Sequence, residues 1–256
     1  MTKKRIATLA TCLTLVGAVA VGGTLALLTS GPKNITNTFA VSDGYDDKNM
    51  DFIVEEQAPT PDALGNYIVS GPYVTTNQEY LNLVEGSYLE KNPRFTLRNA
   101  ADDETTPPDS WVVAKLDATQ IEALITNGIK FDDVNDEDGM STSTGWKIVT
   151  AERENADAEW TYTLGADLTA TALNALEPDS DTKRTYFIYT KVLSADDSGS
   201  TESLFTQLEV KDLNTKMDRI DLTVSGVAVQ ALTNNLEGEG VLSQVMADAV
   251  AAFNAQ

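Results

Sequence analysis

Hydrophobic and polar residues alternate along much of this chain with the period of two that is typical of β-strands. In Thr185–Leu193, for example, Tyr186 and Ile188 fall on one face of an extended chain, and Phe187 and Tyr189 fall on the other. Similar runs predict further strands, at Asn37–Val41, Met50–Val54, Glu79–Val84, Arg94–Arg98, Trp111–Leu116, Trp146–Val149, Trp160–Leu164, Leu204–Val210 and Arg219–Gln230. Clusters of Gly, Pro, Asn and Asp separate these runs. The pattern therefore predicts a mainly β protein, an antiparallel β-sandwich of many short strands.

A few segments have the spacing of short helices instead. Near residues 118–127, Ile121 and Leu124 share one face, Asp117 stands at the N-cap position and Gly128 follows the end. Two further helices are expected, at residues 166–176 and, as a C-terminal helix, at residues 241–253. We interpret the first two as insertions between strands and the last as a cap on the β scaffold.

The N-terminus has the pattern of an export signal. The basic cluster Lys3–Arg5 precedes the apolar run Ile6–Leu28, and Thr29–Pro32 contains helix-breaking residues. This arrangement predicts an N-terminal signal helix. We therefore expect a signal peptide over residues 1–27 and a single domain over residues 28–256.

Small residues mark the expected cleavage region of this signal. Thr24 and Ala26 stand at the two positions that a signal peptidase recognises, so cleavage is expected near Ala26, beside Leu27. After cleavage we expect no stable membrane span. The apolar run is long enough to cross a bilayer, so an uncleaved N-terminal anchor is the alternative.

The chain is strongly acidic, with 18 Lys and Arg against 39 Asp and Glu and a formal net charge of −21. Cleavage would remove Lys3, Lys4 and Arg5, leaving 15 basic residues and a net charge of −24. Such a charge repels nucleic acid and anionic membrane surfaces, so we expect neither as a partner.

Histidine is absent, and Cys12 is the one cysteine of the chain. These facts exclude His-dependent nucleophiles, a His general base and zinc sites built on His. A cleaved product without Cys12 can form no disulfide, so the domain must rely on its own core. No catalytic residues are indicated, and we expect neither an enzyme nor a required cofactor.

One acidic loop contains several side chains that could hold calcium. They are Asp132, Asp133, Asn135, Asp136 and Asp138. An EF-hand loop has glycine at its sixth position, and counting back from Gly139 places Val134 first, where no ligand is available. A looser calcium site is one interpretation of this loop, and a solvated surface loop is the other.

Seven segments, taken in order, resemble one known family. They are Gly22–Leu28, Asn37–Val41, Leu83–Gly86, Lys91–Leu97, Tyr186–Leu193, Ser203–Thr206 and Ile220–Gln230. Their order and spacing are similar to those of the TasA and camelysin (CalY) family of Gram-positive bacteria, whose members are processed by the dedicated signal peptidase SipW. The resemblance runs in pieces over most of the chain.

This resemblance implies a jelly-roll-like sandwich that is secreted and self-associates into fibres of the biofilm matrix or cell surface. In such fibres an N-terminal strand of one subunit completes a sheet of the next. The corresponding segment here is Leu28–Val41. Its residues able to pair as an assembly strand are Ile35, Thr36, Thr38, Phe39 and Val41. The alternative is that this segment is the first strand of its own sheet.

Two other functions are considered beside the fibre subunit. Camelysin has been described as a metalloprotease, but this chain offers only carboxylates as metal ligands, which disfavours that activity. A cell-surface adhesin or binding module is the main alternative. Trp111, Trp146 and Trp160 would then form a carbohydrate platform, whereas their strand-like surroundings favour core positions.

Overall fold

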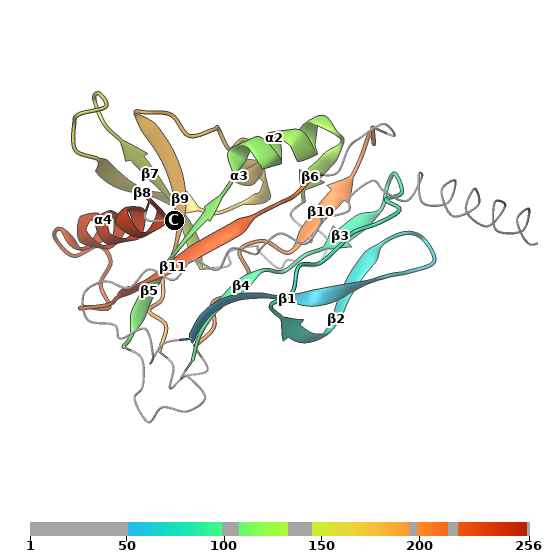
Figure 1. Ribbon diagram of the computed structural model, residues 1–256, viewed down its shortest axis with the longest axis horizontal. Coiled ribbons are helices and arrows are strands. Elements are labelled where there is room, and N and C mark those ends of the chain that lie inside the picture. The colour runs from blue at the N-terminus through green and yellow to red at the C-terminus, as the bar shows by residue number, and fades with distance from the viewer. Residues whose placement is uncertain (1–50, 99–107, 133–144, 195–198, 215–219, 255–256) are drawn as a thin grey trace, which may run out of the picture.

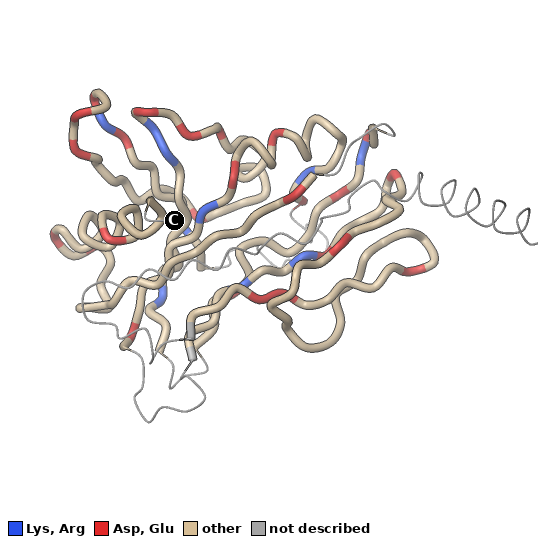
Figure 2. Tube along the Cα trace, in the orientation of Figure 1, with Lys and Arg blue, Asp and Glu red and all other residues tan. Residues whose placement is uncertain are grey.

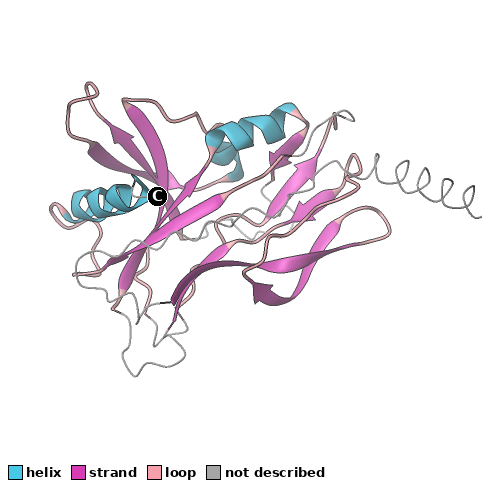
Figure 3. Cartoon of the chain, in the orientation of Figure 1, coloured by secondary structure: helices cyan, strands magenta, loops and turns pink. Residues whose placement is uncertain are grey.

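The computed structural model describes residues 51–98, 108–132, 145–194, 199–214 and 220–254 (Figure 1). The described residues are mainly β, with two sheets and a few short helices (Figure 3). This coarse architecture agrees with the sandwich that the alternating pattern predicts.

The first sheet has six strands, in the order β4-β1-β2-β3-β10-β6. In chain order its strands are β1 (Asp51–Pro61), β2 (Tyr67–Val74), β3 (Tyr88–Glu90), β4 (Arg94–Arg98), β6 (Ile129–Phe131) and β10 (Gln207–Val210). Neighbouring strands are antiparallel except β2 and β3, which are parallel at the pair Tyr67 and Leu89. Strand β1 changes partners along its length, because its first half pairs with β4 and its second half with β2.

The second sheet has five strands, in the order β11-β5-β9-β7-β8, and all its neighbours are antiparallel. Its strands are β5 (Ser110–Leu116), β7 (Trp146–Glu152), β8 (Thr161–Asp167), β9 (Lys183–Tyr189) and β11 (Val224–Gln230).

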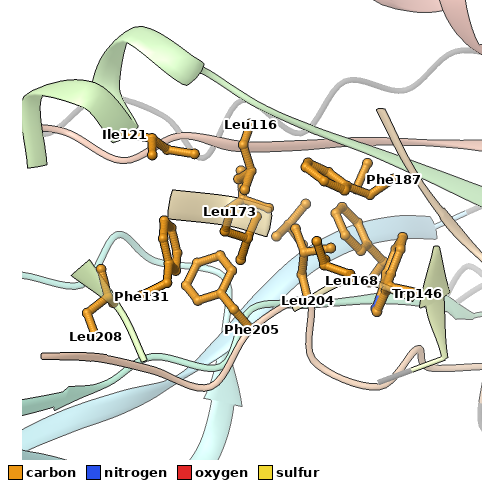
Figure 4. Close-up of a cluster of buried hydrophobic side chains, with 14 of the residues drawn as sticks. Leu116, Ile121, Phe131, Trp146, Leu168, Leu173, Phe187, Leu204, Phe205 and Leu208 are labelled. Atoms are coloured by element: carbon orange, nitrogen blue, oxygen red, sulfur yellow. The ribbon is translucent and has the colours of Figure 1, made fainter. Parts of the chain in front are cut away.

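The main core lies between the two sheets. Figure 4 shows large apolar side chains from both sheets and from the helices meeting there. The ring of Phe95 stacks on Phe52 with centroids 5.8 Å apart and lies 5.6 Å from the ring of Trp146. All three side chains are almost fully buried, so this aromatic group joins β1 and β4 of one sheet to β7 of the other.

A second core covers the opposite face of the five-stranded sheet. Helix α4 (Val241–Asn254) lies there and buries Met246 and Ala249 against the sheet. Because this sheet is buried on both faces, strand β5 is apolar at almost every position instead of alternating.

The two remaining helices have clear local causes. Helix α2 (Ala118–Thr126) begins after Asp117, whose carboxylate accepts a hydrogen bond from Thr119 N–H at 2.9 Å. It ends before Gly128, which has a φ of +84°. Helix α3 (Ala170–Asn174) begins after Thr169, whose hydroxyl caps Ala172 N–H.

Several predicted elements are confirmed by the structure. Strand β4 has the predicted bounds, and β1, β5, β7, β8, β9, β10 and β11 overlap their predictions. The helices predicted near 118–127 and 241–253 are confirmed as α2 and α4. The predicted helix 166–176 contracts to α3, because Ala166 and Asp167 still belong to strand β8.

Other predictions are wrong, for identifiable reasons. The strand expected at Glu79–Val84 is absent because Asn82 has a φ of +57°, which turns the chain out of the extended conformation. Strand β2 was not predicted, since Gly71–Pro72 in its middle has the composition of a turn. Strands β3 and β6 have three residues each, too few to alternate recognisably.

The predicted signal helix of residues 1–27 and the predicted strand at Asn37–Val41 lie outside the described residues. Within the ranges that the structure describes, no helix is both long and apolar enough to span a membrane.

The two sheets approach each other closely at Gly226, so a larger residue there should destabilise the fold. A Cβ added at Gly226 would overlap the ring of Phe95, which Phe52 and Trp146 hold in place. We expect Gly226→Ala to lower the free energy of unfolding by about 1–3 kcal/mol, the usual cost of overpacking a core. Urea unfolding measures this change. Ser225→Ala, at the neighbouring half-buried position, is the matched control, and equal stability of the two variants would contradict the prediction.

Candidate functional site: an open sheet edge beside an interior groove

Two of the four sheet edges are covered by other parts of the described chain. Along β4, segment 199–204 supplies backbone hydrogen bonds, from Thr201 N–H to Phe95 O at 2.8 Å and from Leu204 N–H to Pro93 O at 2.8 Å. At β6, the side-chain amide of Asn174 accepts from Phe131 N–H at 2.9 Å and donates to Phe131 O at 2.7 Å. Neither edge offers a free ladder at these positions.

The outer edge of β11 is different, because no other strand among the described residues pairs with it. Ala231 N–H donates to Asp109 O, so these two residues are a hydrogen-bonded pair. Hydrogen-bonded and non-hydrogen-bonded pairs then alternate along β11 and β5. The backbone groups of every second residue therefore point away from β5. These residues are Val224, Gly226, Ala228 and Gln230.

Most side chains along this edge are apolar, and none is charged. The sequence of β11 is Val-Ser-Gly-Val-Ala-Val-Gln, in which Val224 and Ala228 belong to the core between the sheets. On the opposite face, Val227 and Val229 contact the layer under α4. A mainly apolar strand whose outer ladder is unpaired in the described part of the chain is the type of edge to which another strand adds.

The outer edge of β8 is also free of a described strand partner, but its character differs. Five of its seven residues are exposed, and it includes Asp167 and Gly165. A polar, exposed edge of this kind is less suited to adding an apolar strand.

A groove opens between the two sheets at the Val224 end of β11, and we call it the interior groove. Its volume is about 90 Å³. It is lined by Val54, Glu56, Asn77, Gln78, Tyr80, Leu89, Lys91, Pro93, Leu124, Ile129, Leu208, Ile220, Asp221, Leu222, Thr223 and Val224. Most of these lining residues are apolar, so the groove suits an apolar group.

Charged and polar groups in the groove wall are tied to each other. Lys91 Nζ lies 2.5 Å from Glu56 Oε2, and both side chains are largely buried. Tyr80 O–H donates to Glu90 O at 2.9 Å. Because these groups are satisfied within the chain, the wall does not need a ligand to pair its charge.

Segment 220–223 forms one rim of the groove and continues the line of β11 without strand pairing. Helix α2 fixes it in place, because Thr223 N–H donates to Gln120 Oε1 at 2.6 Å and Gln120 Nε2 donates to Thr223 Oγ1 at 3.2 Å. Half-buried Ile220 and Leu222 stand on this rim. The rim therefore has a defined position relative to the open edge.

A second buried ion pair lies near the groove, on β1 and β4. Arg94 Nη2 lies 2.8 Å from Glu55 Oε1, and Thr96 O–H donates to the same oxygen at 2.7 Å. The Arg94 guanidinium also stacks over the Tyr73 ring, 3.4 Å from its centroid. Through Lys91 and Arg94, Glu55 and Glu56 thus connect β1 to the β3–β4 segment on both faces of the sheet. These ion pairs explain why two carboxylates are buried near the edge of the sheet.

The assembly-strand residues predicted from the sequence lie outside the described residues, as does the cleavage region. They are Ile35, Thr36, Thr38, Phe39 and Val41, and Thr24, Ala26 and Leu27. Of the predicted calcium ligands only Asp132 is described, and its backbone N–H donates to Gln207 O. Asp133, Asn135, Asp136 and Asp138 lie outside the described ranges. Within those ranges, no cluster of three or more His, Cys, Asp or Glu forms a metal site.

The tryptophans do not form a common platform. Trp111 and Trp146 are buried in different cores, each with 1 % of its surface exposed. Trp160 is half-buried, and the guanidinium groups of Arg153 and Arg184 lie 4.4 and 4.8 Å from its ring. The core interpretation is confirmed for Trp111 and Trp146, and the three-tryptophan platform is wrong.

Sequence reasoning missed the groove and its ion pair. Glu56 and Lys91 are 35 positions apart in the chain, and nothing in their local sequences links them. One feature of the sequence did point to this region, namely the apolar ending of the predicted strand Arg219–Gln230. Val227–Val229 break the alternation there because both faces of the strand are buried.

Comparisons of the chain with protein-family models, with curated proteins and with solved structures gave no match.

Tyr80 in the groove wall should make the free energy of unfolding depend on pH in the alkaline range. Burial raises the pKa of its phenol well above the ordinary value of 10.0, and the charges of Glu56 and Glu90 add to this effect. The folded protein keeps the proton that the unfolded chain loses above this value, so the free energy of unfolding should fall as pH rises above 10. We expect Tyr80→Phe to reduce this alkaline slope.

Urea unfolding between pH 8 and 11 measures the effect. Tyr88→Phe, at an exposed tyrosine, is the control and should keep the parent slope. At neutral pH, Tyr80→Phe should cost on the order of 1 kcal/mol, because the bond to Glu90 O is lost. An unchanged alkaline slope in Tyr80→Phe would show that this phenol does not control it.

Proposed function

We propose that this protein is a secreted structural protein, a subunit of extracellular or biofilm matrix fibres that assemble by strand addition. The observation that carries the proposal is the open outer edge of β11, an apolar strand whose outward ladder has no strand partner among the described residues. Residues 1–27 serve as the signal peptide in this proposal. Residues 28–256 form one jelly-roll-like domain.

The N-terminal segment supplies a strand of matching length and pattern. The alternation in segment 35–41 would place Ile35, Phe39 and Val41 on one face of a strand, with Thr36 and Thr38 on the other. Strand β11 has seven residues, and segment 35–41 spans the same length. Main-chain hydrogen bonds supply the affinity of such an addition, and the alternating side chains supply its register.

The symmetry of the contact favours fibres over closed dimers. A donor segment and an acceptor edge are different surfaces of one molecule, so each added copy leaves a new edge for the next. Removal of the signal peptide frees the donor segment and so starts assembly.

Charge sets the conditions under which assembly is favoured. With a net charge of −24 after cleavage, neighbouring copies repel one another at long range. Figure 2 shows acidic residues spread over both sheets and their loops. Strand β11 carries no charged residue. Salt or divalent cations screen the repulsion, so they should promote fibres.

Removal of the donor segment tests the proposal from one side. We expect a mature form lacking residues 28–41 to stay monomeric at concentrations where the parent forms filaments, as seen by electron microscopy and sedimentation. A form lacking residues 28–34 keeps the pairing residues and should still assemble. Filaments in the longer deletion that match those of the parent would refute the donor role.

Proline substitution tests the acceptor edge from the other side. The N–H of Ala228 points away from β5, so Ala228→Pro removes an outward donor but no hydrogen bond to β5. We expect this variant to fold, and we expect most or all of its filaments to be missing from the pellet in sedimentation assays.

Leu164→Pro is the matched control, because it removes an outward N–H from the other open edge, β8. It should assemble as the parent does. The opposite result, with loss of filaments only in Leu164→Pro, would assign the acceptor to β8, and thermal unfolding checks that both variants are folded.

A further inference from the structure

We propose that the interior groove is the socket for the side chain of Phe39 from a second copy of this chain. The inference rests on the proposed function, since it names the contact that anchors the added strand. It adds the register, the anchoring residue and the pocket that receives it.

The register follows from which β11 residues face the space between the sheets. Val224 and Ala228 belong to that core, and Gly226 faces Phe95 there. A strand added to the outer edge places its own residues directly opposite these positions, with side chains on the same face. The donor face that contains Ile35, Phe39 and Val41 must therefore be the one that faces inward.

An antiparallel alignment satisfies this requirement with Phe39 opposite Val224. Asn37 then lies opposite Gly226, and Ile35 lies opposite Ala228. These pairs coincide with the outward-pointing backbone groups of β11, so each can form the double hydrogen bond of an antiparallel ladder.

The groove lies at the position that this register gives to Phe39. It opens at Val224, and its rim continues along the line of β11 through Leu222. Its apolar lining, which includes Val54, Leu89 and Leu222, suits a large apolar side chain. Phe39 is the largest apolar residue of the donor segment, so its burial stabilises the contact most.

Residues 42–50 connect the donor to β1, and their length allows the donor to reach a neighbour. This connection has three aspartates, Asp43, Asp46 and Asp47, against one lysine, Lys48. Charged linkers of one sign repel themselves and extend. Nine fully extended residues span up to about 32 Å, which is long enough to reach the edge of a neighbouring copy.

The first experiment measures the critical concentration for filament formation by sedimentation of the mature protein. We expect Phe39→Ala to raise it by about tenfold or more, because a buried phenyl ring is lost. Thr36→Ala, on the outward face of the donor, should change it less than about threefold. If Phe39→Ala behaves as Thr36→Ala while filaments still form, the socket is refuted and the fibre function stands.

A reciprocal variant tests the socket from the acceptor side. Leu222→Trp places a larger side chain on the half-buried rim and should raise the critical concentration by a similar factor. Leu232→Trp is its control, at a position with 86 % of its surface exposed, and should assemble as the parent does. Equal assembly of the two variants would contradict the socket.

Crosslinking decides whose segment occupies the edge. In the mature form, which lacks Cys12, Thr38→Cys and Ser225→Cys form a directly opposed pair without mutual hydrogen bonds, where the two Cα atoms come within about 4.5 Å and a disulfide can close. Oxidised filaments should give a ladder of covalent multimers on denaturing gels. Thr38→Cys with Thr163→Cys, on the exposed edge of β8, is the control and should give none.

The remaining outcomes separate the two proposals. An intrachain disulfide without multimers would show that the chain fills its own edge, which overturns the proposal of a second copy. Absence of filaments from the parent protein under all salt and calcium conditions would overturn the fibre function itself.

Discussion

The contact between Phe95 and Gly226 is the constraint on which the rest of this structure depends. No backbone ladder joins the two sheets in the described residues, so side-chain packing supplies most of the contact between them. Gly226 has no Cβ, and the Phe95 ring occupies that space while it stacks on Phe52. This contact brings β11 against β1 and β4, and thereby sets where the open edge and the interior groove lie.

Charge pairing gives β1 its position relative to that contact. Glu55 and Glu56 are adjacent in the chain and point to opposite faces, yet each is buried and paired, with Arg94 and Lys91 respectively. Removing ions from water costs free energy, and good geometry is needed to offset it. Such pairs contribute more to a unique arrangement of strands than to net stability. In a chain with 39 acidic residues, two of the 18 basic ones are used in this way at the wall of the groove and beside it.

Much of the fold could be predicted from the sequence, because local patterns carried the information. Arg94–Arg98 alternates clearly and was predicted with its observed bounds, and Asp117 and Gly128 marked the ends of α2. The failures have tertiary causes. Tyr80 and Leu83 have the spacing and apolarity of strand residues, but they are buried anchors of a loop that Asn82 turns. The end of strand β1 at Pro61 pairs with Tyr67 across a short turn. This hairpin continues β2 through Gly71–Pro72, where the composition favours a break.

The candidate site was predictable only in part. The alternating pattern of segment 35–41, the donor that we propose, is local and visible in the sequence, whereas an acceptor edge is defined by what does not pair with it. The groove joins Val54, Leu89 and Leu222, which are far apart in the chain, and no short window of sequence contains it. Pairings of this type become visible only after the strands have been ordered in space.

The side-chain amide of Asn174 on Phe131 has a consequence for the shape of any assembly. The Asn174 amide accepts from Phe131 N–H and donates to Phe131 O, as a neighbouring strand would. A single side-chain amide cannot continue this pairing to the next residues. The six-stranded sheet is blunted at that margin. Because segment 199–204 covers the opposite edge at β4, sheet extension in the proposed fibre would use the five-stranded sheet.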